Sequence, residues 1–112
     1  MASPDELWLV DFGDPLPGEP AFHRPALVIG PPSSFGQQFP FVIVVPTTSR
    51  RRGLSIHVEV EPSEENGLEE TSYLQCELLR SVSARRLVTR LGQLDVGSAA
   101  EVRRVIGTLL DR

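Results

Sequence analysis

The sequence predicts an α+β fold, in which a small antiparallel β-barrel-like sheet is followed by one C-terminal amphipathic helix. Short runs rich in β-branched and aromatic residues are separated by loops that contain glycine and proline. Apolar residues recur at helical spacing only near the C-terminus. The chain has 112 residues, so we expect one domain spanning residues 1–112.

The first half of the chain contains three apolar runs that predict strands. Residues 7–12, LWLVDF, are aromatic and β-branched, and a Gly-Asp pair follows them. A long loop at 13–23, rich in proline and glycine, leads to residues 25–30, PALVIG. This second run is apolar at successive positions, which is typical of a strand that is buried on both faces or lies in a tight barrel. Residues 40–46, PFVIVVP, have the strongest β character in the chain.

The second half begins with a polar loop at 47–53 and continues with further strand-like segments. Residues 55–61, SIHVEVE, alternate between apolar and polar side chains, which predicts a half-exposed strand. The apolar face would hold Ile56, Val58 and Val60, and the exposed face Ser55, His57, Glu59 and Glu61. A turn at 62–70 follows, and the stretches 73–82 and 86–94 read as strands on either side of a bend.

The C-terminal segment predicts the helix. Asp95 is a residue type that caps helix N-termini. The apolar positions after it recur at helical spacing, with charged residues opposite them. They are Val102, Val105, Ile106, Leu109 and Leu110.

Composition excludes several classes of protein. Cys76 is the only cysteine, so an internal disulfide cannot form, and its strand context predicts a buried small hydrophobe. No residue spacing indicates a metal site or a phosphate-binding glycine loop. The acidic N-terminus does not resemble a signal peptide, and no apolar run is long enough to span a membrane. We therefore expect a soluble, cytoplasmic protein that needs no cofactor or metal.

Charge is distributed unevenly along the chain. The net charge is −4, which alone argues against a nucleic-acid partner, yet all 11 basic residues are arginine. A GC-rich genome would explain this bias, and so would a need for bidentate phosphate contacts. Arg50, Arg51 and Arg52 form one basic cluster, whereas acidic residues gather at 59–70. A net-negative protein can still carry a basic groove.

Two polar segments adjoin buried strands: GEPAFHR precedes the second strand and TTSRRRG follows the third. Pro25 restricts the backbone of Arg24, which therefore stands at the beginning of a strand with few conformational options. If these strands pair antiparallel, Arg24 lies beside residues 47–49 and Arg50. A fixed cation beside hydroxyl groups suits an anionic centre such as a phosphodiester. The alternative is an ordinary polar rim on a barrel.

The order of these segments resembles the MazF/PemK/Kid family of toxin endoribonucleases. The resemblance runs through LWLVDFGDP, GEPAFHRPALVIG, FVIVVPTTSRRRG, HVEVEPSEENGL, CELLRSVSARRLVTRLGQL and the final helix. It implies an SH3-like barrel of about five to seven strands and a homodimer. It also implies metal-independent cleavage of single-stranded RNA, with the ribose 2′-hydroxyl as nucleophile and a 2′,3′-cyclic phosphate as product. The partner would be a MazE-like antitoxin with an acidic, partly disordered segment.

The resemblance assigns roles to a few residues. The arginine of the family's Arg-Pro motif falls on Arg24, which would neutralise charge on the phosphorus in the transition state. The strand-end threonine falls on Thr48, which would hold a non-bridging oxygen, with Thr47 as the fallback. Glu19 and His23 match loop residues of some members and are candidates for proton transfer.

The sequence departs from the family pattern at one pair. Some members carry an Arg-x-Asp pair proposed for acid–base work, and the matching positions here are Gln75 and Glu77. Glu77 could keep the role of base, whereas Gln75 cannot supply an acid or a charge. RNA-binding candidates complete the expected site, and they are Thr47, Ser49, Arg50, Arg51, Arg52, Gln75 and Arg80.

Two other functions are compatible with the sequence. One is a non-enzymatic toxin on the same barrel that binds a protein target, as the gyrase-poisoning CcdB group does. The other is a degenerate family member that binds antitoxin but has lost cleavage, which the glutamine at position 75 allows. The recognised RNA sequence would depend on loops, here 13–23 and 49–54.

Overall fold

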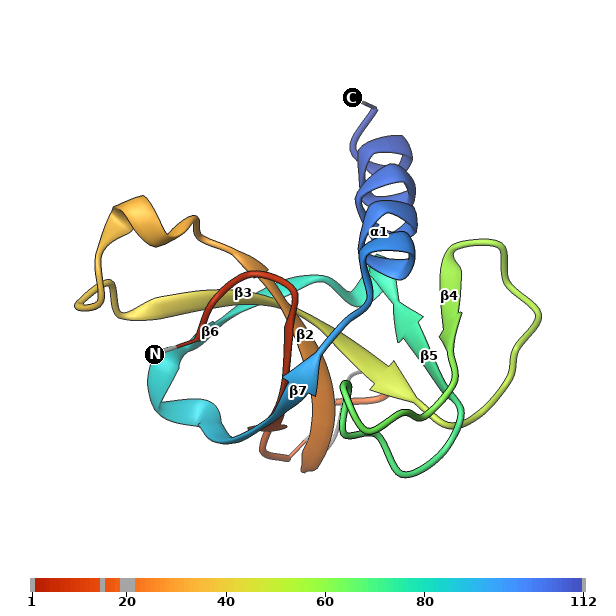
Figure 1. The fold of residues 1–112 in the computed structure, drawn as a ribbon, viewed down its shortest axis with the longest axis horizontal. Coiled ribbons are helices and arrows are strands. Elements are labelled where there is room, and N and C mark those ends of the chain that lie inside the picture. Colours follow the sequence, from red (N-terminus) through yellow and green to blue (C-terminus); the bar gives the residue numbers. More distant parts are fainter. Residues whose placement is uncertain (1, 15, 19–21, 112) are drawn as a thin grey trace.

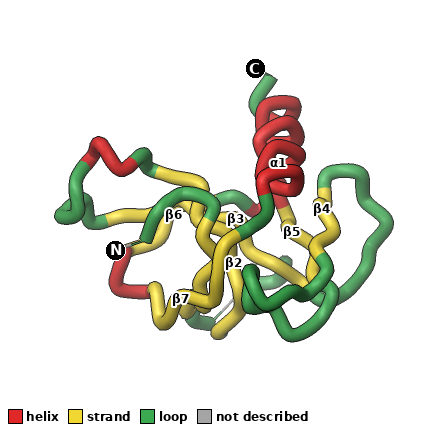
Figure 2. Tube along the Cα trace, viewed as in Figure 1, coloured by secondary structure: helices red, strands yellow, loops and turns green. Residues whose placement is uncertain are grey.

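The structure is a computed structural model that describes residues 2–14, 16–18 and 22–111. The described residues form seven strands, one α-helix and three short 3-10 helices (Figures 1 and 2). The strands are β1 (Glu6–Asp11), β2 (His23–Gly30), β3 (Phe41–Thr48), β4 (His57–Val60), β5 (Ser72–Gln75), β6 (Arg80–Ser83) and β7 (Leu87–Gln93). The helix is α1 (Val96–Leu109), and the 3-10 helices are η1 (Ser33–Phe35), η2 (Cys76–Leu78) and η3 (Ala84–Arg86).

The strands form one antiparallel sheet in the order β4-β5-β3-β2-β1-β7, with β6 pairing β3. Strand β3 is the centre of this arrangement, because its first half pairs with β6 and its end pairs with β5. The sheet is strongly curved but is not closed between β4 and β7. The predicted α+β, barrel-like fold with a C-terminal helix is therefore confirmed.

The core has two clusters, one on each face of β2 and β3. Leu27 and Val45 belong to the cluster that the helix residues Ala99, Val102 and Val105 cover. Val28 and Val44 belong to the other, together with β1 and β6 residues. Burial on both faces explains why β2 and β3 are apolar at successive positions, and the sequence had predicted it for β2.

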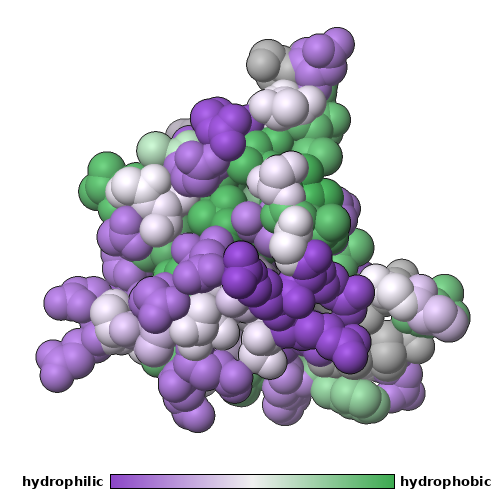
Figure 3. Space-filling model, turned by 90° about the vertical axis from the view of Figure 1, so that its right-hand side faces the viewer, coloured by the Kyte–Doolittle hydropathy of each residue, from purple (hydrophilic) through white to green (hydrophobic). Residues whose placement is uncertain are grey.

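Helix α1 begins where the sequence predicted. The Asp95 side chain accepts a hydrogen bond from the Ser98 backbone N–H at 2.8 Å, and this contact lowers the pKa of the Asp95 carboxyl. The last predicted apolar positions do not reach the core, since Leu109 is 42% exposed and Leu110 54%. Figure 3 shows an apolar region that extends from this helix and a hydrophilic region below it. No described helix is long and apolar enough to cross a membrane.

Two segments differ from the sequence prediction in their boundaries. The stretch 73–82 is not one strand, because η2 separates β5 from β6. Because of this break, β5 pairs with β4 and with the end of β3, whereas β6 pairs with the first half of β3. Strand β3 also extends further than expected, through Thr47 and Thr48, which pair with Leu74 and Tyr73.

The turn between β4 and β5 lies directly against β7. Asn66 is buried, and its side chain bonds to backbone groups of Ser63, Leu68 and Glu61. Gly67 has φ +70°, and a Cβ there would overlap the carbonyl oxygen of Leu91. A Cβ at Gly92 would likewise overlap the carbonyl oxygen of Glu65. Backbone-to-backbone contact therefore fixes the distance between this turn and the sheet.

Candidate active site

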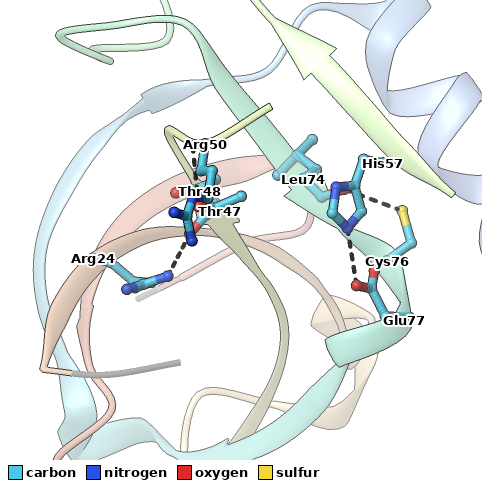
Figure 4. A network of polar contacts seen from close by, with 8 residues as sticks. All are labelled: Arg24, Thr47, Thr48, Arg50, His57, Leu74, Cys76 and Glu77. Atoms are coloured by element: carbon cyan, nitrogen blue, oxygen red, sulfur yellow. Dashed lines mark hydrogen bonds and ion pairs between the residues drawn. The ribbon is translucent and has the colours of Figure 1, made fainter. Parts of the chain in front are cut away.

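The antiparallel pairing of β2 and β3 brings the two polar segments together. Ala26 pairs with Pro46, and continuing this register places Arg24 opposite Thr48. The Arg24 guanidinium donates from Nη1 to the Thr47 carbonyl oxygen at 3.1 Å (Figure 4). Thr47 Oγ1 donates in turn to the Pro25 carbonyl oxygen at 2.8 Å. The expected meeting of Arg24 with the end of β3 is confirmed.

A cavity of about 410 Å³ opens at this junction. Strands β2 and β3 supply one side of it, and the turn after β4 supplies the other. Its lining residues are Leu9, His23, Arg24, Pro25, Thr47, Thr48, Ser49, Gly67, Leu68, Glu69, Glu70, Ser72 and Leu91. The wall formed by 67–70 and Leu91 was not identified from the sequence, because it depends on packing between segments distant in the chain.

Arg24 is held in one orientation while part of its donor capacity stays unused. One N–H group contacts the Thr47 carbonyl, and Nε is buried with no hydrogen-bond partner in the described part of the chain. A guanidinium has five N–H donors, so several remain for a ligand. A positioned cation with unsatisfied donors suits a phosphate, which can accept two parallel bonds from it.

The hydroxyl groups of the two threonines are not equivalent. Thr47 is 3% exposed, and its hydroxyl proton is directed to the Pro25 carbonyl. Thr48 Oγ1 instead accepts a hydrogen bond from the Arg50 backbone N–H at 3.2 Å, which leaves its own proton available to donate. This difference favours Thr48 over Thr47 as the donor to a bound oxyanion.

Among the acid–base candidates, His23 lines the cavity. Its side chain is exposed, with Nε2 3.7 Å from Asp11 Oδ2. Glu19 lies outside the described residues.

Glu77 and Gln75 do not line the cavity. Glu77 lies on η2, where its Oε2 is 2.9 Å from His57 Nε2. Gln75 is buried, and its Oε1 has no partner among the described residues. Figure 4 shows the His57–Glu77 pair well separated from Arg24. Within one chain, the structure therefore does not bring Glu77 to the Arg24 site.

The basic candidates fall into two groups. Arg50, Arg51 and Arg52 are exposed in the loop after β3 and form no ion pair with any described residue. Arg80 lies on β6, where its guanidinium is 5.7 Å from the centre of the Phe12 ring. A cation over an aromatic face is a stabilising contact. Only the loop group adjoins the cavity, because Ser49 and Thr48 precede it directly.

Cross-strand pairing extends the site toward β4. Thr48 pairs with Tyr73, and Tyr73 pairs with Glu59, so these three side chains share one face of the sheet. His57 lies on the same face, but its side chain is only 2% exposed. The expected exposure of His57 was wrong, because the contact with Glu77 on η2 buries its ring. Alternation in β4 carried the signal for Glu59, but the pairing register with β5 did not follow from the sequence.

Cys76 cannot serve as a nucleophile in this state. The residue is 1% exposed, and burial raises the pKa of its thiol to about 11, with a further contribution from Glu77. A thiol that stays protonated at neutral pH is unreactive. The described residues also include no group of three or more His, Cys, Asp or Glu side chains that could hold a metal ion.

Comparison with known proteins identifies the family. Residues 4–110 match the family described as PemK-like, MazF-like toxin of type II toxin–antitoxin system. A crystal structure of MazF from Deinococcus radiodurans is 26% identical over 99% of this chain and 97% of that chain, with a TM-score of 0.84. A MazE–MazF structure from the same organism is 25% identical over 97% and 94%, with a TM-score of 0.76. An endoribonuclease in complex with its cognate antitoxin from Mycobacterial species shares the fold at 18% identity, over 99% and 96%, with a TM-score of 0.80.

The barrel-like sheet and the family match over almost the whole chain define a class of small toxins. The chain belongs to the PemK-like, MazF-like toxins of type II toxin–antitoxin systems.

Proposed function

We propose that this chain is a sequence-specific endoribonuclease toxin that cleaves single-stranded RNA without a metal ion and that a cognate antitoxin neutralises. The observation that carries the proposal is the position of Arg24. Its guanidinium is fixed by the Thr47 carbonyl, keeps unused donors, and lines the same cavity as Thr48. This is the arrangement that a phosphodiester undergoing attack requires.

In the proposed reaction, the 2′-oxygen of a ribose attacks the adjacent phosphorus. The bond from phosphorus to the 5′-oxygen of the next nucleotide breaks, which leaves a 2′,3′-cyclic phosphate and a 5′-hydroxyl. Arg24 would stabilise the negative charge that develops on the non-bridging oxygens, and the Thr48 hydroxyl would donate to one of them. The exposed His23 imidazole, which lines the cavity, is a candidate for taking or giving the transferred proton.

The identity of the second proton-transfer group stays a prediction. Glu19 precedes His23 by four residues, and Glu77 is the family-matched carboxylate. Because Glu77 lies away from the cavity of its own chain, it could act only if the proposed homodimer brought it to the partner's site.

The proposed partners follow from charge. The three exposed arginines at 50–52 would bind RNA phosphates along the groove next to Thr48. An acidic, MazE-like antitoxin segment would compete for the same surface, and the MazE–MazF structure is of such a pair. The toxin would act in the cytoplasm, where RNA and antitoxin are both present.

The test is cleavage of a defined single-stranded RNA by purified protein in excess EDTA, followed by analysis of the new ends. We expect cleavage with cyclic phosphate and 5′-hydroxyl ends. A matched oligonucleotide with a single 2′-deoxy nucleotide at the cut position should resist cleavage there. Cleavage of that substrate at the same bond would exclude 2′-hydroxyl attack. Complete inactivity toward a diverse RNA pool would instead favour the degenerate family member that Gln75 allows.

A further inference from the structure

A second cavity, of about 300 Å³, lies on the sheet face that continues from Thr48. Its lining residues are Arg51, Gly53, Leu54, Ser55, His57, Glu59 and Tyr73. Tyr73 is the cross-strand partner of both Thr48 and Glu59, so one row of side chains joins the two cavities. Strands in a sheet are about 4.8 Å apart, which places Glu59 roughly 10 Å from Thr48 along this row.

The cavity combines an aromatic side chain with polar groups of both kinds. Tyr73 offers a partly buried ring, and aromatic rings are the usual platforms on which proteins stack single-stranded bases. Arg51 offers an exposed guanidinium with no ion-pair partner among the described residues. Glu59 offers an exposed carboxylate, which accepts hydrogen bonds but cannot donate them.

His57 supplies a second acceptor. Its Nε2 is 2.9 Å from a Glu77 carboxylate oxygen, and because an ionised carboxylate only accepts, Nε2 carries the proton. In the neutral ring the remaining nitrogen, Nδ1, is then an acceptor. The side chain is 2% exposed, and Nδ1 has no hydrogen-bond partner in the described part of the chain. An unsatisfied buried acceptor costs free energy that a ligand's N–H group would recover.

Two acceptors beside an aromatic platform select among the four bases. On its Watson–Crick edge, guanine alone presents two adjacent donors, the ring N1–H and the N2 amino group. Adenine and cytosine pair one amino donor with a ring acceptor, and uracil has one N–H between two carbonyl oxygens. Arginine is also the usual partner of the guanine O6 and N7 acceptors.

We propose that this second cavity binds a guanine base of the RNA, one or two nucleotides from the cut bond. The base stacks on Tyr73, its N2 amino group donates to Glu59, its N1–H donates to His57 Nδ1, and Arg51 contacts O6 or the adjoining phosphate. This inference rests on the proposed endoribonuclease function, whose specificity it would explain.

The experiment measures equilibrium binding, which does not require cleavage. The probes are fluorescent 2′-O-methyl pentanucleotides, UUGUU and the same strand with inosine, adenine, cytosine or uracil at the centre. Inosine differs from guanine only by the missing N2 amino group. We expect UUGUU to bind about 10-fold or more tightly than UUIUU, since a hydrogen bond to a charged group accounts for such a ratio. The Tyr73→Leu variant should weaken UUGUU binding about 5- to 150-fold through the loss of stacking.

The decisive variant is Glu59→Gln, which keeps an acceptor oxygen but loses the charge, and it should therefore lower the guanine-to-inosine ratio several-fold. Glu64→Gln is its control, because it makes the same charge change at an exposed position in the turn after β4. Three results would each overturn the proposal. They are equal affinities for all five probes, no binding of any probe, and a guanine-to-inosine ratio that Glu59→Gln leaves unchanged. Cleavage of RNA without a guanine preference would refute the subsite and leave the nuclease standing. Guanine-selective binding without cleavage would support the guanine site and refute the proposed nuclease activity.

Discussion

Replacing Arg24 by alanine is the strongest single test of the proposed site. The substitution removes the hydrogen bond to the Thr47 carbonyl and the donors that face the cavity. Loss of one preorganised donor to a developing oxyanion lowers the rate about 10²–10³-fold. We therefore expect kcat/KM for a fluorogenic RNA substrate to fall by at least that factor.

The same substitution should leave the protein folded. The structure assigns Arg24 one hydrogen bond of 3.1 Å, worth about 1 kcal/mol, against a total stability of about 5–15 kcal/mol for a domain of this size. Urea unfolding of the variant should confirm this. Arg24→Lys should recover little activity, because a single ammonium group cannot hold the Thr47 carbonyl and also present two parallel donors to a phosphate.

Arg86→Ala is the matched control. Its guanidinium also donates to a strand carbonyl, that of Asp11, at 3.1 Å, but it does not line the cavity. Its removal should cost similar stability and little activity. If Arg24→Ala folds and cleaves within threefold of the wild-type rate, Arg24 does not stabilise the transition state and the proposed mechanism fails.

Three further predictions concern the loop, the helix and the thiol. Changing all three of Arg50, Arg51 and Arg52 to glutamine should flatten the salt dependence of RNA binding without changing the unfolding midpoint. The slope of log K against log salt should change by about 0.7 for each phosphate that the loop no longer binds, and an unchanged slope would show that the loop does not touch RNA. Asp95→Ala should lower stability by about 1 kcal/mol at pH 7. The cap lowers the pKa of Asp95, so this contribution to stability is present above about pH 4 and is lost as the pH falls through the lowered pKa. Urea unfolding curves of the two proteins should therefore converge in acid, and a difference that stays constant with pH would contradict the assignment. Cys76 should resist iodoacetamide at pH 8 in the native protein and react in urea, and rapid alkylation of the native protein would show that the thiol is accessible. Because burial raises the pKa of this thiol to about 11, its contribution to stability is full below about pH 8.5 and is lost as the pH rises through 11.

The parts of the site that followed from the sequence are those set by local chemistry and strand pairing. Pro25 marks where a strand begins, and TTS marks where one ends, so antiparallel pairing was enough to bring Arg24 to the end of β3. The alternating burial of β4 also followed from its sequence, apart from His57.

The remaining parts depend on contacts between distant segments. Whether His57 is exposed depends on where η2 places Glu77, and η2 interrupts a stretch that looks like one strand. The cavity wall at 67–70 depends on how closely a turn approaches β7. No local pattern encodes either distance, and Glu19 lies outside the described residues.

The close contact at Gly92 has a consequence for the shape of the cavity beside Arg24. Any side chain at Gly92 would push the turn at Glu65 outward, and residues 67–70 of the cavity wall would move with it. The cavity beside Arg24 would widen although Gly92 does not line it. Gly92 on β7 therefore sets the width of a cavity that it does not line, through its contact with the turn between β4 and β5.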